Sequence, residues 1–343
     1  MVRMPLSSAP RSPIRVRSRA ASPVHLPRTV EGAGMSAFYL GADVGGTASR
    51  FCLTDQAGAV IRRGTAPGAT GHMFNPDARA AFERTVDAIA ACVPEPLSGL
   101  VIGMTGYGPR AETDIAEIIE KRLKVAPAKI FARDDIELAF RAVFAPGKGH
   151  LVSAGTGSIA VHLTEAETLL RIGGRGTMID DGGSGAWIAL AALRALYRRI
   201  DEDGSPGDMT ILADRLFAAM GGSDWSDTRS YVYGGDRGRI GALAKAVAEA
   251  AEEGDGFADQ LLRQAGFELA RLGNILIARG GTHPVAFIGG VLTLSPVIGA
   301  TILAELKGEA MFPVLDQAEG AARLARNHFS AGEAGQHFSQ DKA

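Results

Sequence analysis

The chain has 343 residues, of which 46% are hydrophobic and 22% charged, and its formal net charge is −2. This size and composition predict a water-soluble globular protein large enough for two domains. The charge balance excludes the basic surplus that nucleic-acid binding requires, so a small molecule is the expected partner. The sequence has no run of about eighteen apolar residues, which excludes an ordinary transmembrane helix.

The chain contains two cysteines, Cys52 and Cys92, which lie far apart in apolar surroundings. Two such residues cannot build a disulfide framework, a zinc ribbon or a CxxC redox motif within one chain. This pattern fits a reducing compartment, and we expect the protein to be cytoplasmic.

Both ends of the chain are predicted to lack regular structure. Residues 1–36 are rich in Arg, Ser and Pro and show no period, so they are expected to be a disordered extension. This segment could be an organellar transit peptide, or the protein could begin at Met35. Residues 327–343 are polar and aperiodic and are expected to form a loose tail.

Three strands are predicted at the start of the ordered chain, followed by alternating helices and strands. The first helix is expected to begin at Asn75-Pro76-Asp77, a good N-terminal cap. The predicted strands of this half are 38–43, 50–53, 59–61, 100–104 and 129–132, and the later helices are 115–123 and 136–144.

The second half begins with the same pattern of strand, glycine-rich turn and strand, at residues 150–163. We interpret this as a weak internal duplication, the alternative being a chance similarity of two hairpins. A third strand at 169–172, a strand at 285–288 and six helices at 185–199, 209–220, 240–251, 257–277, 296–306 and 320–326 complete the prediction. The chain is therefore predicted to be an α/β protein with an N-terminal lobe, 37–147, and a C-terminal lobe with a helical insertion, 148–326.

Two glycine-rich turns, one in each half, each join a pair of predicted strands. They are Gly45-Gly46-Thr47 and Gly155-Thr156-Gly157-Ser158. Glycine lets backbone N–H groups approach phosphate oxygens, and Thr and Ser hydroxyls add donors. Either turn alone is more often only a hairpin turn, but the two together would grip a polyphosphate from both sides.

Two other nucleotide-binding signatures are absent. Gly147-Lys148-Gly149 lacks the upstream glycine and the following Ser or Thr of a GxxxxGK[ST] loop, and GADVGG does not fit GxGxxG. The sequence therefore excludes a P-loop and a dinucleotide-binding site of the Rossmann type.

Four segments in order carry a resemblance to one superfamily. LGADVGGT (40–47), AGTGS (154–158) and FIGGV (287–291) resemble the first phosphate, second phosphate and adenosine motifs of the sugar kinase, heat-shock protein and actin superfamily. GGRGTMIDDGGSGAWI (173–188) resembles the GGxGxxxGDEGSxxWI block of N-acetylglucosamine kinases within the BadF/BadG/BcrA/BcrD ATPase family. The resemblance covers residues 38–326.

This resemblance implies a two-lobed ribonuclease H-like (actin-like ATPase) fold, made of duplicated βββαβα units with a nucleotide cleft between the lobes. It implies ATP and Mg²⁺ as cofactors, with Asp43 holding Mg²⁺ through water. The two glycine-rich turns would bind the ATP phosphates, and Gly289 and Gly290 would lie against the adenosine.

The family's catalytic carboxylate opens the helix before the second phosphate strand, and Asp135 in RDDIE (133–137) matches that place best. A carboxylate there can accept the proton of a hydroxyl that attacks the γ-phosphorus. The alternative is that Asp134 and Asp135 cap the helix. One residue can cap the helix while the other catalyses.

The same resemblance implies that Asp135, Gly174, Arg175 and Asp181 bind the sugar. Without it, Asp181 would be interpreted as a turn residue beside two glycines. Arg175 replaces the family's Trp and could pair with an acidic substituent of the substrate, as in muramic or uronic acid derivatives. The alternative is a surface salt bridge.

Two further departures from the family pattern concern the substrate site. Gly182 replaces the family's Glu, and the Asn expected in the loop after the third strand is not obvious in residues 68–75. The chemistry of a kinase is therefore better preserved than the identity of the sugar.

Taken together, the motifs predict an ATP-dependent kinase that acts on an amino sugar, at the 6-hydroxyl of N-acetylglucosamine or glucosamine. No nucleic-acid or membrane partner is expected, and a homodimer is compatible with the sequence. One alternative is an ATPase activator of 2-hydroxyacyl-CoA dehydratases, because MTGYG (104–108) resembles a segment of those activators. The activators hold an iron-sulfur cluster that needs thiolates near the second phosphate motif, and neither cysteine of this chain is there. The other is a non-catalytic sugar or nucleotide sensor. Asp135 and both phosphate-binding turns argue against it, and the missing Glu leaves it open.

Overall fold

A computed structural model of the protein describes residues 37–94 and 96–330. The predicted N-terminal extension and residues 331–343 of the predicted tail lie outside the described residues. Asn327 to Ser330, which we also assigned to the tail, form the last turn of helix α11 (Gln317–Ser330). The helix continues here because Phe329 packs against Gly99 of the first sheet.

The first sheet has five strands in the order β3-β2-β1-β4-β5. β1 is antiparallel to β2 and parallel to β4, which is in turn parallel to β5. The strands are β1 (Tyr39–Val44), β2 (Ala48–Thr54), β3 (Val60–Pro67), β4 (Gly99–Met104) and β5 (Ile130–Asp134).

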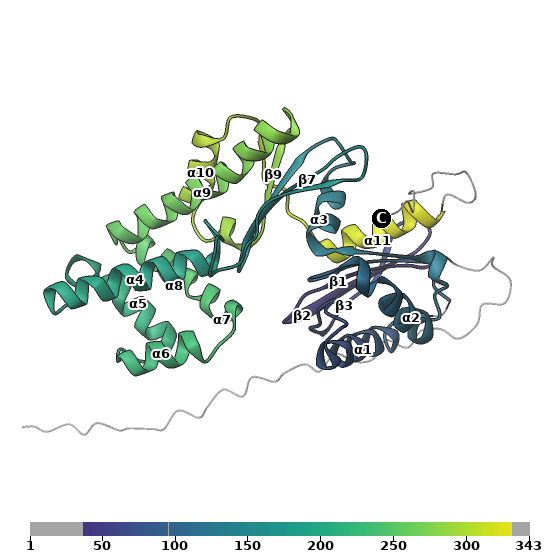
Figure 1. Ribbon diagram of the computed structural model, residues 1–343, viewed down its shortest axis with the longest axis horizontal. Helices are drawn as coiled ribbons and strands as arrows, with labels where there is room; N and C mark the ends of the chain where they lie inside the picture. Colours follow the sequence, from purple (N-terminus) through teal and green to yellow (C-terminus); the bar gives the residue numbers. More distant parts are fainter. Residues whose placement is uncertain (1–36, 95, 331–343) are drawn as a thin grey trace, which may run out of the picture. The chain divides into compact units, whose positions relative to one another are not determined.

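Helices cover both faces of this sheet (Figure 1). α1 (Pro76–Ala90) and α2 (Glu112–Leu123) pack on one face, against Leu40, Ala42 and Val44 of β1. α11 packs on the other face against β1, β2 and β4, so this helix, which we predicted in the C-terminal lobe, completes the N-terminal sheet. Successive residues of a strand point to opposite faces, which explains the two separate cores.

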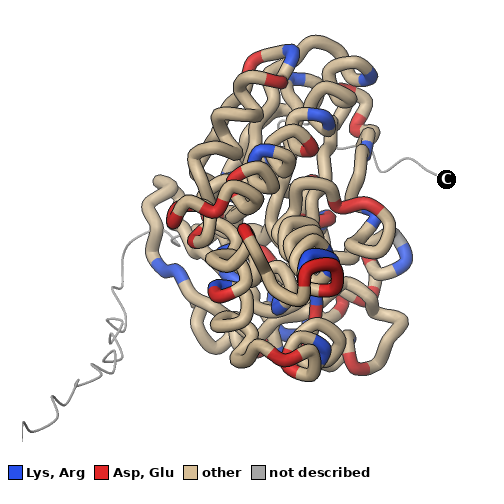
Figure 2. Tube along the Cα trace, turned by 90° about the vertical axis from the view of Figure 1, so that its left-hand side faces the viewer, with Lys and Arg blue, Asp and Glu red and all other residues tan. Residues whose placement is uncertain are grey.

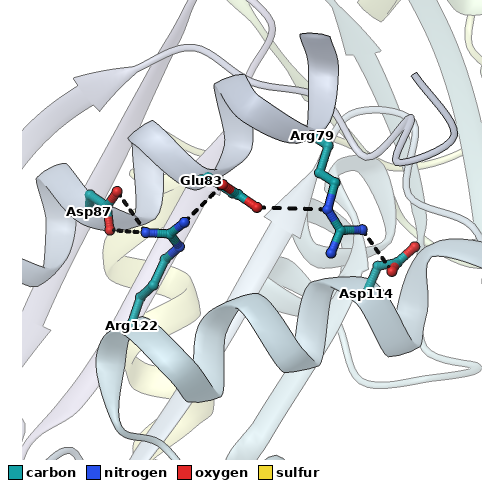
Figure 3. A network of polar contacts seen from close by, with 5 residues as sticks. All are labelled: Arg79, Glu83, Asp87, Asp114 and Arg122. Carbon is teal, nitrogen blue, oxygen red and sulfur yellow. Dashed lines mark hydrogen bonds and ion pairs between the residues drawn. The ribbon is translucent and has the colours of Figure 1, made fainter. Parts of the chain in front are cut away.

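The two outer helices of the first sheet are also joined by ion pairs at their surface (Figure 3). Arg122 of α2 lies 2.8 Å from Glu83 and 2.6 Å from Asp87 of α1, and Arg79 of α1 lies 2.7 Å from Asp114 of α2. Exposed pairs contribute little individually, so we assign them to fixing the angle between the helices rather than to the bulk of the stability.

The second sheet has the order β10-β9-β6-β7-β8. Taken from the other end, as β8-β7-β6-β9-β10, this order matches that of the first sheet, with β6 in the place of β1. β6 is antiparallel to β7 and parallel to β9, as β1 is to β2 and β4. The predicted duplication is therefore confirmed in the topology. The strands are β6 (His150–Ala154), β7 (Ser158–Leu163), β8 (Leu169–Gly173), β9 (Val285–Ile288) and β10 (Ala310–Met311).

The insertion between β8 and β9 is helical, as predicted, but the sequence analysis missed α6 (Trp225–Tyr233) and the first half of α7 (Arg237–Ala242). The helix predicted over 240–251 is wrong as a single element, because the chain turns at the buried Leu243 between α7 and α8. The other helices are α4 (Gly185–Asp203), α5 (Thr210–Met220), α8 (Ala244–Glu252), α9 (Gly256–Gly280) and, after β9, α10 (Pro296–Glu305).

Helix α3 (Asp135–Val143) contacts both sheets. Ile136 and Phe140 pack with buried residues of β6, β7 and β9, whereas Leu138 packs with Tyr39 and Val101 of the first sheet. Since α3 also contacts α11, these two helices connect the duplicated halves.

Two further features of the described residues are the distribution of charge on the surface and the character of the helices. Basic and acidic residues are interspersed over the face shown in Figure 2. Among the described helices, none combines the length and the apolarity that crossing a membrane requires.

Candidate active site

The parallel strands of the first sheet end at one edge, and the predicted acids lie there. Asp43 is the second-last residue of β1, and Asp134 ends β5 opposite Met104 of β4. The Thr105 N–H donates to the Val44 carbonyl at 3.2 Å, which holds the ends of β1 and β4 together. Ligands of open α/β sheets bind outside the carboxyl ends of the strands, so this edge is the candidate active site.

Asp134 and Asp135 make different contacts at the start of α3. Asp134 is the N-cap, and its Oδ1 accepts a hydrogen bond from the Ile136 N–H at 3.3 Å. Asp135 is the first helical residue, and its Oδ2 accepts a hydrogen bond from Thr105 Oγ1 at 2.5 Å. Burial, and then the neighbouring Asp135 carboxylate, raise the pKa of Asp134 to about 6. The cap is therefore made by Asp134, which leaves Asp135 available for the predicted catalytic role.

Asp43 lies close to the start of α11. The Gln317 amide, oriented to donate, places its nitrogen 3.1 and 3.3 Å from the two Asp43 oxygens. Burial, and then the Asp135 carboxylate, raise the pKa of Asp43 to about 6, against the opposing effect of Arg50, its partner on β2. A cation bound beside Asp43 would offset the repulsion from the Asp135 carboxylate.

A magnesium ion fits the residues at this edge only as a partly hydrated, substrate-bound ion. No three His, Cys, Asp or Glu side chains in the part of the chain that the structure describes are placed to hold a metal by themselves. Mg²⁺ commonly keeps several waters and takes one or two protein carboxylates together with phosphate oxygens. Asp43, half-buried at the carboxyl end of β1, suits such a site.

The first glycine-rich turn joins β1 to β2, as predicted, and its residues Gly46 and Thr47 are exposed. The segment after β3 packs closely against it. The Ala69 N–H donates to the Gly45 carbonyl at 3.0 Å, and a Cβ at Gly68 would lie 2.4 Å from the Gly46 carbonyl oxygen. The segment after β3 therefore packs against the turn, while Gly46 and Thr47 remain accessible to a ligand.

The second glycine-rich turn, 155–158, joins β6 to β7 and is fixed to the start of α4. The Gly185 N–H donates to the Gly155 carbonyl at 2.9 Å, and the Ala186 N–H donates to the Thr156 carbonyl at 3.2 Å. These contacts hold the turn rigidly, which is what close recognition of a phosphate requires.

Ser158 contributes to this turn differently from our expectation. Its side chain is buried, and its Oγ donates to the Gly182 carbonyl at 2.7 Å. The hydroxyl proton is therefore engaged inside the protein, and the donors that the turn can offer to a phosphate are backbone N–H groups and the Thr156 hydroxyl.

The predicted adenosine motif lies beside the second turn. Gly289 has φ +108°, and a Cβ there would lie 2.3 Å from the carbonyl oxygen of Ala154, the last residue of β6. Only glycine permits both this backbone conformation and this approach. Gly290 is exposed and begins the short helix η4 (Gly290–Thr293).

Asp181 is buried against the second turn. Its Oδ1 accepts from the Gly176 N–H at 3.1 Å and its Oδ2 from Thr177 Oγ1 at 3.5 Å, and a Cβ at Gly157 would lie 3.0 Å from Oδ2. Arg237 of α7 lies 4.0 Å from the same Oδ2. Burial raises the pKa of Asp181, and the Gly176 N–H is the largest opposing effect. Asp181 thus fixes the segment that we expected to bind the sugar.

Gly174 and Arg175 lie in the exposed part of that segment. Gly174 has φ +64° and approaches Ile159, and the Arg175 N–H donates to the Asp180 carbonyl at 3.2 Å. Among the residues that the structure describes, Arg175 makes no salt bridge, so the surface salt bridge that we considered is not found.

The sequence analysis missed three contributors to these edges: Thr105, Gln317 and Arg237. Thr105 follows a predicted strand, which places it at the right edge, but its bond to Asp135 depends on β4 pairing with β5. Gln317 and Arg237 carry no sequence signal, since each acts on a residue far away in the chain.

The cysteines lie in the N-terminal half, away from the second turn in sequence. Cys52 is fully buried in β2, and burial raises its pKa to about 11. Cys92 follows α1 and is partly buried. Neither lies in the segment where the activator alternative needs a thiolate.

A model of the BadF/BadG/BcrA/BcrD ATPase family matches residues 40–325. The chain belongs to this family. The matched range includes the three strand-end motifs and the 173–188 block.

Two curated relatives of this ATPase family member are named as kinases. The chain is 29% identical over 177 residues to an N-acetylmuramic acid/N-acetylglucosamine kinase of Clostridium acetobutylicum, a match that covers 51% of this chain and 56% of that enzyme. It is 24% identical over 315 residues to an N-acetyl-D-glucosamine kinase of Dictyostelium discoideum, covering 84% of this chain and 98% of that enzyme.

Solved structures confirm the fold of this ATPase family member. A candidate N-acetylglucosamine kinase from Porphyromonas gingivalis superimposes with a TM-score of 0.69 at 18% identity, and one from Chromobacterium violaceum with 0.62 at 24%. Both matches cover 84% of this chain and 99% of the other. A glucokinase from Streptomyces griseus gives a TM-score of 0.52. The predicted two-lobed ribonuclease H-like fold, shared with actin-like ATPases and sugar kinases, is therefore confirmed.

Proposed function

We propose that this protein is an ATP-dependent amino-sugar kinase, which transfers the γ-phosphoryl group of MgATP to a sugar hydroxyl. The proposed acceptor is the 6-hydroxyl of N-acetylglucosamine or glucosamine. Support comes from the family, from the two kinases named above, and from the arrangement of the two strand edges.

The observation that carries the proposal is the position of Asp135. It opens α3 at the carboxyl end of the parallel strands, and it is not needed for the helix cap because Asp134 provides that cap. The Thr105 hydroxyl holds one of its oxygens at 2.5 Å, so the carboxylate is oriented. A carboxylate placed in this way can accept the proton of an attacking hydroxyl.

The glycine-rich turns would bind the ATP phosphates through backbone N–H groups, with Gly289 and Gly290 against the adenosine. Asp43 would hold Mg²⁺ through water, and the bound ion would supply charge neutralisation at the phosphates. Asp135 would then accept the hydroxyl proton as the bond between the sugar oxygen and the γ-phosphorus forms and the bond from that phosphorus to the departing ADP breaks. Asp181, Gly174 and Arg175 would bind and orient the sugar.

The test is ADP release by the purified protein with MgATP across a panel of N-acetylglucosamine, glucosamine, glucose and N-acetylmuramic acid. We expect at least one amino sugar to stimulate ADP release well above the rate without sugar. Asp135→Asn should lower kcat by about 1,000-fold, within the range that loss of a general base and its orientation can produce.

Asp134→Asn is the matched control, because it makes the same chemical change one residue earlier and asparagine is an equally good N-cap. It should keep most of the activity. The proposal fails if no sugar stimulates ADP release, or if Asp135→Asn is as active as the Asp134→Asn control.

A further inference from the structure

Arg237 is the first residue of α7, in the half of this helix that the sequence analysis did not predict. Its side chain is 61% exposed, whereas its carboxylate partner Asp181 is only 3% exposed. The two groups are 4.0 Å apart, at the outer limit of a salt bridge. The guanidinium is therefore held near a buried acid while most of its surface stays open to a ligand.

α7 lies directly against the second glycine-rich turn. A Cβ at Gly241 of α7 would lie 3.4 Å from the Thr156 methyl carbon, and a Cβ at Gly185 would lie 3.0 Å from the Gly241 carbonyl oxygen. Asp181, which holds Arg237, touches the same turn at Gly157. Arg237 thus projects from an element that is packed onto the proposed phosphate site.

Arg237 adds a positive charge beside a proposed phosphate site whose turns are uncharged. The residues of the two turns, 45–47 and 155–158, are uncharged, and the neighbouring edge carries Asp43, Asp134 and Asp135. The nearby Arg171 is paired with Asp134 at 3.5 Å. A transferred phosphoryl group spreads negative charge over its equatorial oxygens, which donors in a neutral turn stabilise less than a cation does.

We propose that Arg237 is a catalytic residue that donates hydrogen bonds to the phosphoryl group during transfer, with Asp181 as the residue that positions it. This inference rests on the proposed kinase function. The planar guanidinium offers two parallel donors to phosphate oxygens, which a lysine ammonium cannot reproduce.

The experiment compares the wild type with Arg237→Ala, Arg237→Lys and Arg239→Ala, using MgATP and uncharged N-acetylglucosamine or glucosamine, so that no anionic group on the sugar can be the ligand of the arginine. We expect Arg237→Ala to lower kcat by about 100-fold or more, as the loss of one charge-stabilising donor does. Added guanidine at millimolar concentration should restore part of this loss, a result that a merely structural role for Arg237 would not produce.

Arg239→Ala is the matched control on the same helix. The Arg239 guanidinium stacks over the Tyr231 ring at 4.2 Å and is thereby engaged elsewhere. Its kcat should stay within about threefold of the wild type. If Arg237→Ala melts at a much lower temperature, Arg237→Lys replaces it and must still lose about tenfold in kcat.

The outcomes separate this inference from the function on which it rests. A wild type that phosphorylates a sugar, with Arg237→Ala as active as Arg239→Ala or without rescue by guanidine, overturns the role of Arg237 alone. A wild type that phosphorylates no sugar overturns the kinase proposal. In that case the slow hydrolysis of ATP must show the same loss in Arg237→Ala, or the role of Arg237 is overturned as well.

Discussion

The two sheets share one strand order but carry different residues at equivalent places. Four residues before the glycine-rich turn, β1 has Gly41 where β6 has Leu151, and two residues before it β1 has Asp43 where β6 has Ser153. The two sheets thus share the same arrangement of strands. The acid near the end of the central strand, Asp43 of β1, has no counterpart in β6.

The helices that follow the last strand of each sheet show the same divergence. α3 begins at Asp135 after the cap residue Asp134, and α11 begins at Gln317 after Asp316, whose Oδ1 accepts from the Glu319 N–H at 3.0 Å. Where α3 has Asp135, α11 has Gln317, an uncharged amide beside Asp43. The caps are retained, and the residue next to each cap has become an acid in one half and an amide in the other.

The comparison teaches that the halves have taken separate tasks. Both halves present a glycine-rich turn whose backbone N–H groups would suit phosphate. The first half adds carboxylates at its strand ends, which would suit a metal ion and a proton, and the second half adds Arg237, which would suit phosphate. One topology used twice can supply both carboxylates and phosphate-binding groups. The strand order fixes where the strands end, whereas the residues at those ends can differ between the two halves.

The largest expected effect is a loss of stability when Gly41 of β1 is replaced by leucine, the residue at the equivalent position 151 of β6. A Cβ at Gly41 would lie 2.1 Å from the Ala322 backbone N and 2.2 Å from the Ala318 carbonyl oxygen, so α11 rests directly on β1. Gly41→Leu should lower the free energy of unfolding by about 3 kcal/mol or more, because backbone cannot move aside as a flexible side chain can. Urea denaturation measures this change.

Gly299→Ala in α10 is the control, since a Cβ there meets nothing within 4 Å. It should leave stability unchanged or raise it by up to about 1 kcal/mol. Equal stability of Gly41→Leu and the wild type would contradict the close packing of α11 on the first sheet.

The next effect tests the contrast between Asp43 and Ser153. The pKa of Asp43 in the folded protein is raised to about 6 from an ordinary value of 3.8, so its carboxyl favours the folded state when protonated and this contribution is lost as pH rises through that range. Asp43→Asn, which cannot ionise, should therefore be more stable than the wild type by up to about 3 kcal/mol near pH 8, and by much less near pH 4.

The measurement is chemical denaturation of both proteins at the two pH values, with Ser153→Ala as a control whose difference from the wild type should not depend on pH. The same variant is expected to lose kinase activity, because it removes the carboxylate proposed to hold Mg²⁺. A stability difference that is identical at both pH values would show that Asp43 has no raised pKa.

The smallest expected effect is on the free energy of unfolding, and it compares a buried hydroxyl of the second turn with an exposed hydroxyl of the first. Ser158 opens β7 where Ala48 opens β2, so Ser158→Ala gives the second hairpin the residue of the first. The buried Gly182 carbonyl would lose its donor, which should cost about 1–2 kcal/mol in the free energy of unfolding. Thr47→Ala, at an exposed site of the first turn, should change it by less than about 0.5 kcal/mol. A stability loss for Thr47→Ala as large as for Ser158→Ala would refute this difference.

Much of the fold could be predicted because its buried strands are short apolar runs between glycine-rich turns. β4, β6 and β9 were located to within a residue for this reason. β3 was predicted over 59–61 but extends to Pro67, since its residues are mostly exposed and its length is set by pairing with β2. α6 was missed because Thr228 is the one residue that it buries fully, which leaves no apolar period to detect.

The sequence by itself determined the positions of the two glycine-rich turns, of Asp43 and of Asp135, because each stands at the end of a strand whose apolar run is local. Only the tertiary structure decided which groups meet there: Thr105 with Asp135, Gln317 with Asp43, and Arg237 with Asp181. These pairs join residues from different elements, so they depend on sheet register and helix docking, which are fixed by the packing of the whole core and not by local periodicity.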